Sequence, residues 1–375
     1  MINVIHFHSG GGGFNIGDDA VACSIRDMLC RHLKVGEYAS MGINKLRERR
    51  AWNSQLLSKP VSPQTINTYD LCIIGGGGLY SNWYFPLDNQ LIRSIKAPII
   101  LFGIGCNRDF GERRLSESSK RSIVMLNRHA RLSSVRDRGT YFFLKKVGIK
   151  NVELVGDPVI FLEAKRRKAN LNITHEKEPR IGINVACHNY NLQSRYLKSV
   201  IATYARVCRF LIDSRNAQIV YLKHTPSEDF VVSILKEIIP ITVANYCPDY
   251  DLLRRLKIRF PFLPMRLKDC RPYEIDSVYS SLDLVIGMHL HSAIFAFKNC
   301  VPVINVAYNV KNYYFMDLIE ERDKTIYVDQ VDSLQLKKMI NHAMSDSSKT
   351  RRKFKILKDK MWKKQEAFLQ KIKFL

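Results

Sequence analysis

Along this chain, short apolar runs alternate with longer segments in which apolar residues recur every three or four positions. Short runs are typical of buried strands, and the longer spacing is typical of amphipathic helices. Their regular alternation predicts repeated strand–helix–strand units and therefore parallel sheets. In the first half we expect strands at 2–7, 71–74, 99–102, 132–135 and 152–155, with helices at 18–33, 88–95, 116–129 and 138–147.

The alternation is interrupted between residues 163 and 180, where Lys, Arg, Asn and Glu are dense and apolar residues are few, as in a connection between domains. It then resumes, with strands expected at 181–185, 219–222, 241–244, 284–286 and 301–306 and helices at 196–214, 230–239, 275–281, 292–297 and 333–344. This pattern predicts an α/β protein of two doubly wound, Rossmann-like domains facing a cleft, an arrangement like that of GT-B transferases. We place the domains at 1–165 and 181–345, the linker at 166–180 and a carboxy-terminal helix at 346–375.

The carboxy-terminal segment predicts a basic amphipathic helix. Between Lys349 and Leu375 there are eleven Lys or Arg against Asp359 and Glu366, a net charge of +9. Its apolar residues fall on one stripe, formed by Phe354, Leu357, Met361, Phe368, Ile372 and Leu375. Two interpretations stay open: the stripe packs back over the domains, or the helix contacts anionic lipid headgroups.

Composition and net charge indicate the cellular location of the protein and the charge of its partners. The chain has 375 residues, of which 46% are hydrophobic, and no window approaches the roughly 20 consecutive apolar residues that span a bilayer. Nine cysteines without a Cys-x-x-Cys pair, and no visible signal peptide, favour a reducing, cytoplasmic location. The net charge of +24 favours anionic partners. In the lipid-contact interpretation, the basic helix and the basic segment 254–271 hold the protein peripherally at the inner face of the cytoplasmic membrane.

Three glycine-rich turns each follow a predicted strand, at 10–13, 75–78 and 103–105. Ligands of parallel sheets bind at the carboxyl ends of the strands, where glycine amides and helix amino termini can hold an anion. Neither the second nor the third turn matches a dinucleotide or P-loop fingerprint. We expect an anionic substrate to be bound by Asn15, Gly17, Gly76, Gly77, Gly78 and Gly105.

Two charged residues stand at equivalent positions. Asp18 begins a predicted helix, where it is either an N-cap or an acid/base group for a substrate hydroxyl. Arg136 follows the strand at 132–135, where it either clamps a carboxylate or phosphate or pairs with Asp137 or Asp157 as scaffold.

The strand at 284–286 is followed by His289, His291 and Ser292. Zinc would need further ligands at the right spacing, and no local partner is visible, so no metal is expected. We expect these residues to contact a phosphate, with one histidine giving a proton.

In this order and spacing, the pieces resemble the polysaccharide pyruvyltransferase family, over the chain up to about Asn341. The resemblance rests on Asn15-x-Gly17-Asp18, Gly75 to Gly78, Ser134-Val135-Arg136-Asp137, Gly156-Asp157-Pro158 and Gly287-Met288-His289-Leu290-His291 with Pro302 following. Members move the enolpyruvyl carbons of phosphoenolpyruvate onto two hydroxyls of a sugar as a ketal. The resemblance implies a role in capsule or exopolysaccharide biosynthesis, phosphoenolpyruvate as donor and no cofactor. The implied acceptor is a sugar in a polysaccharide or in a lipid-linked oligosaccharide precursor.

The family pattern assigns Asp18 as the acid/base group at the acceptor hydroxyl, Arg136 as the donor clamp and His291 as the donor contact and proton donor. His289 departs from the pattern, since the family usually has an arginine there, with permanent charge and forked donors that bear on donor affinity. The nearest alternative is a GT-B glycosyltransferase that uses a nucleotide sugar. We do not expect nucleic acid as a partner, because no recognisable nucleic-acid module accompanies the charge.

Overall fold

The computed structural model describes residues 1–9, 15–46, 61–163, 178–187, 191–245 and 271–375. The first glycine run at 10–13, most of the predicted linker 166–180 and the basic segment 254–271, except its last residue, lie outside these ranges.

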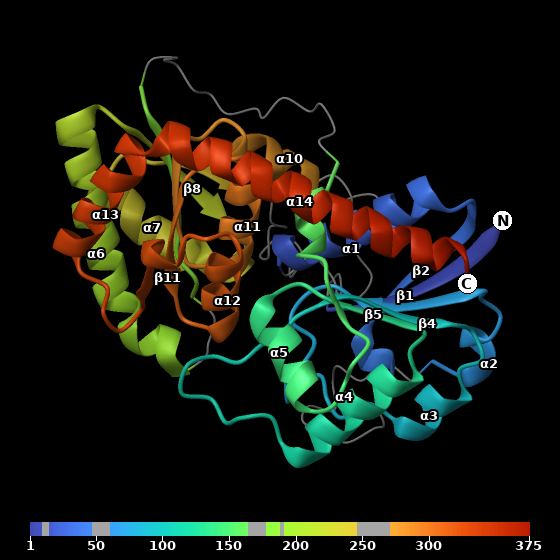
Figure 1. Cartoon of the computed structure of the whole chain (residues 1–375). Helices are drawn as coiled ribbons and strands as arrows, with labels where there is room; N and C mark the ends of the chain where they lie inside the picture. Colours follow the sequence, from blue (N-terminus) through green and yellow to red (C-terminus); the bar gives the residue numbers. More distant parts are fainter. Residues whose placement is uncertain (10–14, 47–60, 164–177, 188–190, 246–270) are drawn as a thin grey trace, which may run out of the picture.

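The first half contains a six-stranded parallel sheet with the order β2-β1-β3-β4-β5-β6 (Figure 1). Its strands are β1 Ile2–His8, β2 Val35–Gly42, β3 Leu71–Gly75, β4 Ile99–Ile104, β5 Leu132–Val135 and β6 Glu153–Leu154. Its helices are α1 Ile16–His32, η1 Ile43–Leu46, α2 Pro63–Ile66, α3 Asn89–Ser94, α4 Glu117–His129, α5 Arg138–Lys146 and η2 Pro158–Phe161.

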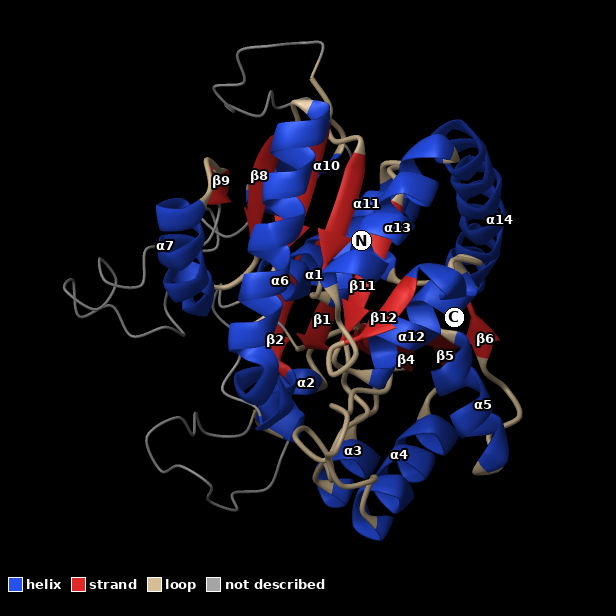
Figure 2. Ribbon diagram, turned by 90° about the vertical axis from the view of Figure 1, so that its left-hand side faces the viewer, coloured by secondary structure: helices blue, strands red, loops and turns tan. Residues whose placement is uncertain are grey.

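The second half contains another six-stranded parallel sheet, with the order β12-β11-β10-β7-β8-β9 and helices beside its strands (Figure 2). The strands are β7 Arg180–Asn184, β8 Gln218–Lys223, β9 Thr242–Asn245, β10 Leu284–Gly287, β11 Val303–Ala307 and β12 Thr325–Tyr327. The helices are α6 Asn191–Arg215, η3 Pro226–Glu228, α7 Asp229–Ile238, α10 Arg271–Tyr279, α11 Leu290–Lys298, α12 Val310–Leu318, η5 Arg322–Lys324, α13 Ser333–Ser345 and α14 Ser347–Lys373.

Both strand orders change direction at one point, between β1 and β3 in the first sheet and between β7 and β10 in the second. Loops leave such a switch point in opposite directions, and this opens a ligand crevice at the carboxyl ends of the strands. Asp18 lies in the first turn of the helix that follows β1, the second glycine run follows β3 directly, and His291 lies in the first turn of the helix that follows β10. The fold therefore places these predicted site residues at the two switch points, while Gly105 and Arg136 follow the neighbouring strands β4 and β5.

The apolar stripe of α14 packs back over both halves, as one of the two interpretations predicted. Phe354 stacks edge to face on Phe297 of α11 at 5.0 Å, and Phe368 does the same on Phe102 of β4 at 5.5 Å. Figure 1 shows α14 running across both halves. One predicted member of the stripe was wrong: Leu375 follows the end of the helix and is 56% exposed. Among the described residues, no helix combines the length and apolarity needed to cross a bilayer.

Candidate active site

The carboxyl ends of the two sheets face each other and are joined by backbone hydrogen bonds. After β4 and β11 the chain forms an antiparallel bridge, in which the amide of Phe110 donates to the carbonyl of Tyr308 at 3.1 Å. The amide of Ile16, at the start of α1, donates to the carbonyl of His224, which follows β8, at 3.1 Å. Loops from both halves are thereby held around one site.

At the centre of this site, Gly17 lies directly against the imidazole of His291. A Cβ atom at position 17 would come within 2.0 Å of His291 Nδ1 and 2.2 Å of its Cγ. The first turns of α1 and α11 can approach this closely only because residue 17 has no side chain. Gly17 thus acts through packing against a catalytic candidate.

We expect Gly17→Ala to destabilise the protein by about 1–3 kcal/mol, because the added methyl overlaps a buried ring and forces the two helix starts apart. Urea unfolding measures this change. The matched control is Gly42→Ala, where a Cβ meets no atom within 4 Å, and its effect should stay within about 0.5 kcal/mol. Equal effects for the two variants would contradict the packing argument.

His291 is 7% exposed, and among the described residues no hydrogen-bond partner reaches its Nε2. Burial lowers the pKa of His291 well below its ordinary value, and the positive charges of Arg136 and Lys311 contribute in the same direction. The ring is therefore neutral at pH 7 in the absence of a ligand. An anionic ligand beside Nε2 would favour its protonated form.

Asp18 lies in the first turn of α1, half-buried, and accepts a hydrogen bond from Ser9 Oγ at 3.2 Å. It is not the N-cap: that position is Asn15, whose side chain accepts from the Gly17 amide at 2.9 Å. Burial raises the pKa of Asp18, while Lys311, Arg136 and the Ser9 hydroxyl act against the rise. A carboxylate whose pKa is raised is a better proton acceptor than an ordinary one, which suits the removal of a proton from a hydroxyl.

Arg136 is 3% exposed and lies between two buried carboxylates. Its Nη1 donates to Asp157 Oδ2 at 3.0 Å, and its Nε lies 3.7 Å from Asp137 Oδ2. The scaffold pairing considered from the sequence is therefore present. Its Nη2 points towards the second glycine turn, 3.5 Å from where a Cβ on Gly78 would lie. Arg136 thus combines a structural role with a position at the site.

The structure adds a cation that sequence analysis missed. Lys311, in the first turn of α12, donates from Nζ to Asn107 Oδ1 in the first half at 3.2 Å. Burial lowers the pKa of Lys311, and Arg136 lowers it further, whereas Asp109 and Asp18 raise it. One feature of the sequence could have indicated Lys311. It lies just after Asn309, a polar residue that follows an apolar run and whose side chain caps the next helix, α12.

His289 and Ser292 are held by their own half of the protein. His289 Nε2 lies 3.1 Å from Glu228 Oε1, and its ring stacks on His224 at 5.3 Å. Burial lowers the pKa of His289 to about 3, so the ring is neutral. The Ser292 hydroxyl donates to Asn184 Oδ1 at 3.0 Å. These contacts fix the loop that carries His291.

The glycine amides divide into two groups. Gly76 donates to the carbonyl of Phe102 at 2.7 Å, and Gly105 donates to that of Gly77 at 2.9 Å. Gly77 and Gly78 have amides that no hydrogen bond between described residues engages. Of the four glycines predicted to bind an anion here, the latter two are therefore the better placed.

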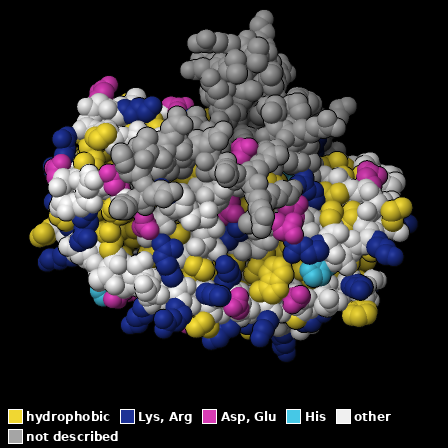
Figure 3. Space-filling model, turned by 90° about the horizontal axis from the view of Figure 1, so that it is seen from above, with side chains coloured by type: hydrophobic (Ala, Val, Ile, Leu, Met, Phe, Trp, Pro, Cys, Tyr) yellow, Lys and Arg dark blue, Asp and Glu magenta, His cyan; other side chains and the backbone are white. Residues whose placement is uncertain are grey.

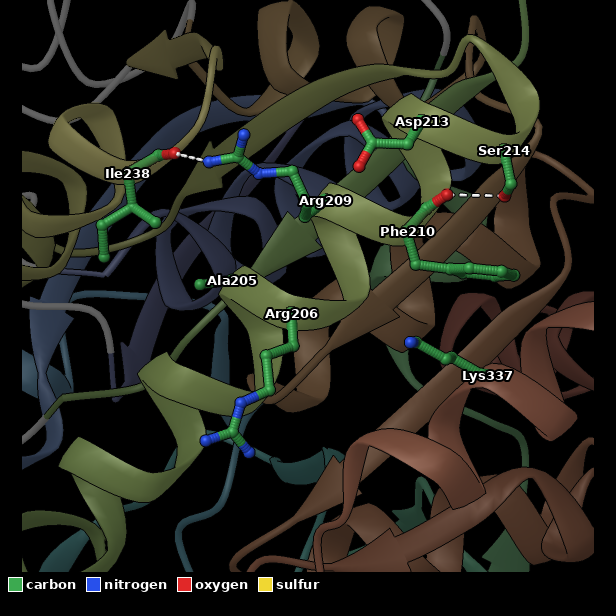
Figure 4. Close-up of a pocket in the computed structure, with 8 residues that line it drawn as sticks. All are labelled: Ala205, Arg206, Arg209, Phe210, Asp213, Ser214, Ile238 and Lys337. Carbon is green, nitrogen blue, oxygen red and sulfur yellow. Dashed lines mark hydrogen bonds between the residues drawn. The ribbon is translucent and has the colours of Figure 1, made fainter.

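An open groove of about 590 Å³ lies away from this site, between α6, α13 and the end of α7. In Figure 4, Arg209 reaches the carbonyl of Ile238, at 2.6 Å, and Lys337 points towards the ring of Phe210, 4.8 Å from its centre. None of the predicted site residues lines it. Within the described ranges, no group of three or more His, Cys, Asp and Glu residues is arranged to hold a metal ion.

A family model described as polysaccharide pyruvyl transferase matches residues 15–310 of this chain. No curated protein matches it significantly. Among solved structures, S. aureus MnaA with UDP gives a TM-score of 0.56 at 12% identity, covering 92% of this chain and 91% of that one. UDP-GlcNAc 2-epimerase from Methanocaldococcus jannaschii gives a TM-score of 0.52 at 11% identity, covering 92% of this chain and 93% of that one. Anabaena HepE with UDP-glucose gives 0.50 at 13%, covering both chains completely. At such identities the likeness concerns the fold alone, and it confirms the GT-B-like prediction.

Proposed function

Because this chain belongs to the polysaccharide pyruvyl transferase family and is an enzyme of that type, we propose that it transfers pyruvate from phosphoenolpyruvate to a sugar. Two hydroxyls of the acceptor become a ketal, and phosphate is released. The acceptor is a polysaccharide precursor or a lipid-linked oligosaccharide, and no further cofactor takes part.

One observation carries this proposal: His291, Arg136 and Lys311 converge from both halves on Asp18. Gly17, which precedes Asp18, lies directly against the ring of His291. A Cβ on Gly77 would lie 3.5 Å from Asp18 Oδ1, and one on Gly78 would lie 3.5 Å from Arg136 Nη2 and 2.7 Å from the Cβ of Asn107. Asn107 in turn accepts the hydrogen bond from Lys311 Nζ. Phosphoenolpyruvate carries a phosphate and a carboxylate on one small carbon frame. Two cations and a neutral histidine that can become protonated suit such a donor.

In the proposed reaction, protonated His291 gives its proton to the methylene carbon of phosphoenolpyruvate, and positive character develops at the neighbouring carbon. The first sugar hydroxyl attacks that carbon as Asp18 takes its proton. The C–O bond to phosphate then breaks, and the second hydroxyl adds in its place. One hydroxyl proton restores His291 and the other leaves with phosphate, so atoms and charges balance. Arg136 and Lys311 stabilise the departing phosphate.

The test is calorimetric titration with phosphoenolpyruvate, UDP, GDP and NAD, which needs no knowledge of the acceptor. We expect selective binding of phosphoenolpyruvate, and roughly a 10- to 100-fold loss of affinity in His291→Ala, because a hydrogen bond to a charged group is removed. The matched control is His129→Ala, an exposed histidine at the end of α4, which should bind normally.

Selective binding of UDP or GDP would replace this proposal with the nucleotide-sugar glycosyltransferase. If none of the four compounds binds measurably, this would contradict a donor site that is formed before the acceptor binds.

A further inference from the structure

The outer face of α14 is a cationic surface with no counterpart in the chemistry proposed above. The helix contains eleven Lys or Arg and two acidic residues, a net charge of +9 within a chain of +24. Its apolar face is buried against both halves, which fixes which residues point outwards. In the face seen in Figure 3, Lys and Arg side chains are spread over the described surface, with several along the lower edge among acidic and hydrophobic ones.

The residues opposite the buried face form a line at helical spacing, which we call the outward stripe. It consists of Lys349, Arg352, Ile356, Lys360, Lys363 and Phe374, all exposed. No ion pair between described residues engages its four cations. The two acidic residues of α14, Asp359 and Glu366, are exposed beside the stripe, and cations outnumber them on this face. The helix is about 40 Å long at the usual rise per residue. The stripe is therefore a basic ridge along the protein surface.

We propose that the outward stripe docks this enzyme onto an anionic phospholipid surface. Each cation near such a surface contributes attraction, and four in line add up along one helix. Ile356 is 51% exposed and Phe374 84%, and apolar side chains among cations suit the headgroup region better than a nucleic-acid backbone. Because the apolar stripe of α14 is already buried, contact occurs through charge at the surface and not through insertion of the helix.

The test compares two variants with the same net charge. The stripe variant combines Lys349→Glu, Arg352→Glu, Lys360→Glu and Lys363→Glu. The control combines Lys198→Glu, Arg206→Glu, Lys236→Glu and Lys338→Glu, which are exposed residues of α6, α7 and α13, and of these Arg206 lines the groove in Figure 4. Each replacement changes the charge by two, so both variants fall from +24 to +16. All eight residues are exposed, and folding is checked by thermal unfolding.

Binding is measured by sedimentation with phosphatidylcholine vesicles that contain either no phosphatidylglycerol or about one-third of it. We expect the wild type to bind only the anionic vesicles, and less so at high salt. The stripe variant should lose on the order of 100-fold or more in binding, and the control less than about 10-fold. Equal losses would overturn the proposal, as would equal binding to neutral vesicles. So would tight binding of duplex DNA or RNA, in place of vesicles, that depends on the same stripe.

Binding of phosphoenolpyruvate should be the same in the two variants and the wild type, because none of the changed residues lies at the active site. A failed docking proposal therefore leaves the proposed reaction untouched. Conversely, absence of phosphoenolpyruvate binding in all three proteins would count against the reaction and not against docking.

Discussion

Replacing Arg136 with alanine is expected to destabilise this protein by about 3–5 kcal/mol, because it removes one partner of a buried ion-pair cluster. Arg136 is 3% exposed, and the carboxylates of Asp137 and Asp157 beside it are equally buried. Without the guanidinium, two carboxylates remain in a site of low dielectric with no cation between them. Urea unfolding measures the loss, and the variant should also fail to bind phosphoenolpyruvate.

The destabilisation should depend on pH with a definite sign. Burial raises the pKa of Asp137 and of Asp157 above their ordinary values, although Arg136 counteracts this. Between its unfolded and folded pKa, such a group binds more protons in the folded state, so stability falls as pH rises. In Arg136→Ala both pKa values rise further. The difference in the free energy of unfolding between wild type and variant should therefore be larger at about pH 8 than at about pH 5.

The matched control is Arg138→Ala, which changes a half-exposed arginine at 3.5 Å from Asp317. Pairs of this kind contribute little, so stability should change by no more than about 0.5 kcal/mol. A destabilisation of Arg136→Ala that is equally small, or that grows at low pH, would contradict the account of a buried cluster.

The central strands could be predicted from sequence because parallel sheets are covered on both faces. All five residues of β3 and all six of β4 are buried, so each leaves a continuous apolar run bounded by glycine turns. The predicted strands 71–74 and 99–102 lie within these bounds. The helices that follow a capping residue, such as α4 after Ser116 and α5 after Asp137, were also found within one residue.

The elements that sequence analysis missed lack this signal. Strand β2 is half-exposed at the sheet edge and contains Gly36 and Glu37, so its own residues give no clear strand pattern. Its pairing with β1 stabilises it as a strand. Strand β12 has three residues, and α2 has four. Helix α12 mixes apolar and polar residues on all sides. Its stability comes from packing on neighbours that the sequence does not identify.

The same limit applies to the site. Positions at strand ends follow from a parallel sheet, and they indicated Asp18, Arg136 and His291. Contacts between the two halves do not follow from local patterns. The approach of Gly17 to His291, and the reach of Lys311 to Asn107, depend on how the sheets dock. Lys311 was therefore missed with the helix that carries it.

Replacing Lys311 with methionine is expected to weaken binding of phosphoenolpyruvate by about 30-fold to several thousand-fold, because truncating one partner of a buried charge pair costs about 2–5 kcal/mol. Methionine keeps most of the volume and removes the charge. Calorimetric titration measures the loss. The matched control is Lys338→Met, an exposed lysine on α13, which should bind as the wild type does.

The pH dependence identifies the ammonium group itself. In the protein without a ligand, burial holds the pKa of Lys311 below its ordinary value of 10.5. A bound anion stabilises the charged form and therefore raises this pKa. Wild-type affinity should therefore fall as pH rises through the interval between the free and bound pKa values. Arginine stays charged throughout this range, so Lys311→Arg should retain its affinity from about pH 7 to about pH 10. If affinity in Lys311→Arg falls as steeply as in the wild type, another group titrates, and Lys311 does not hold the donor.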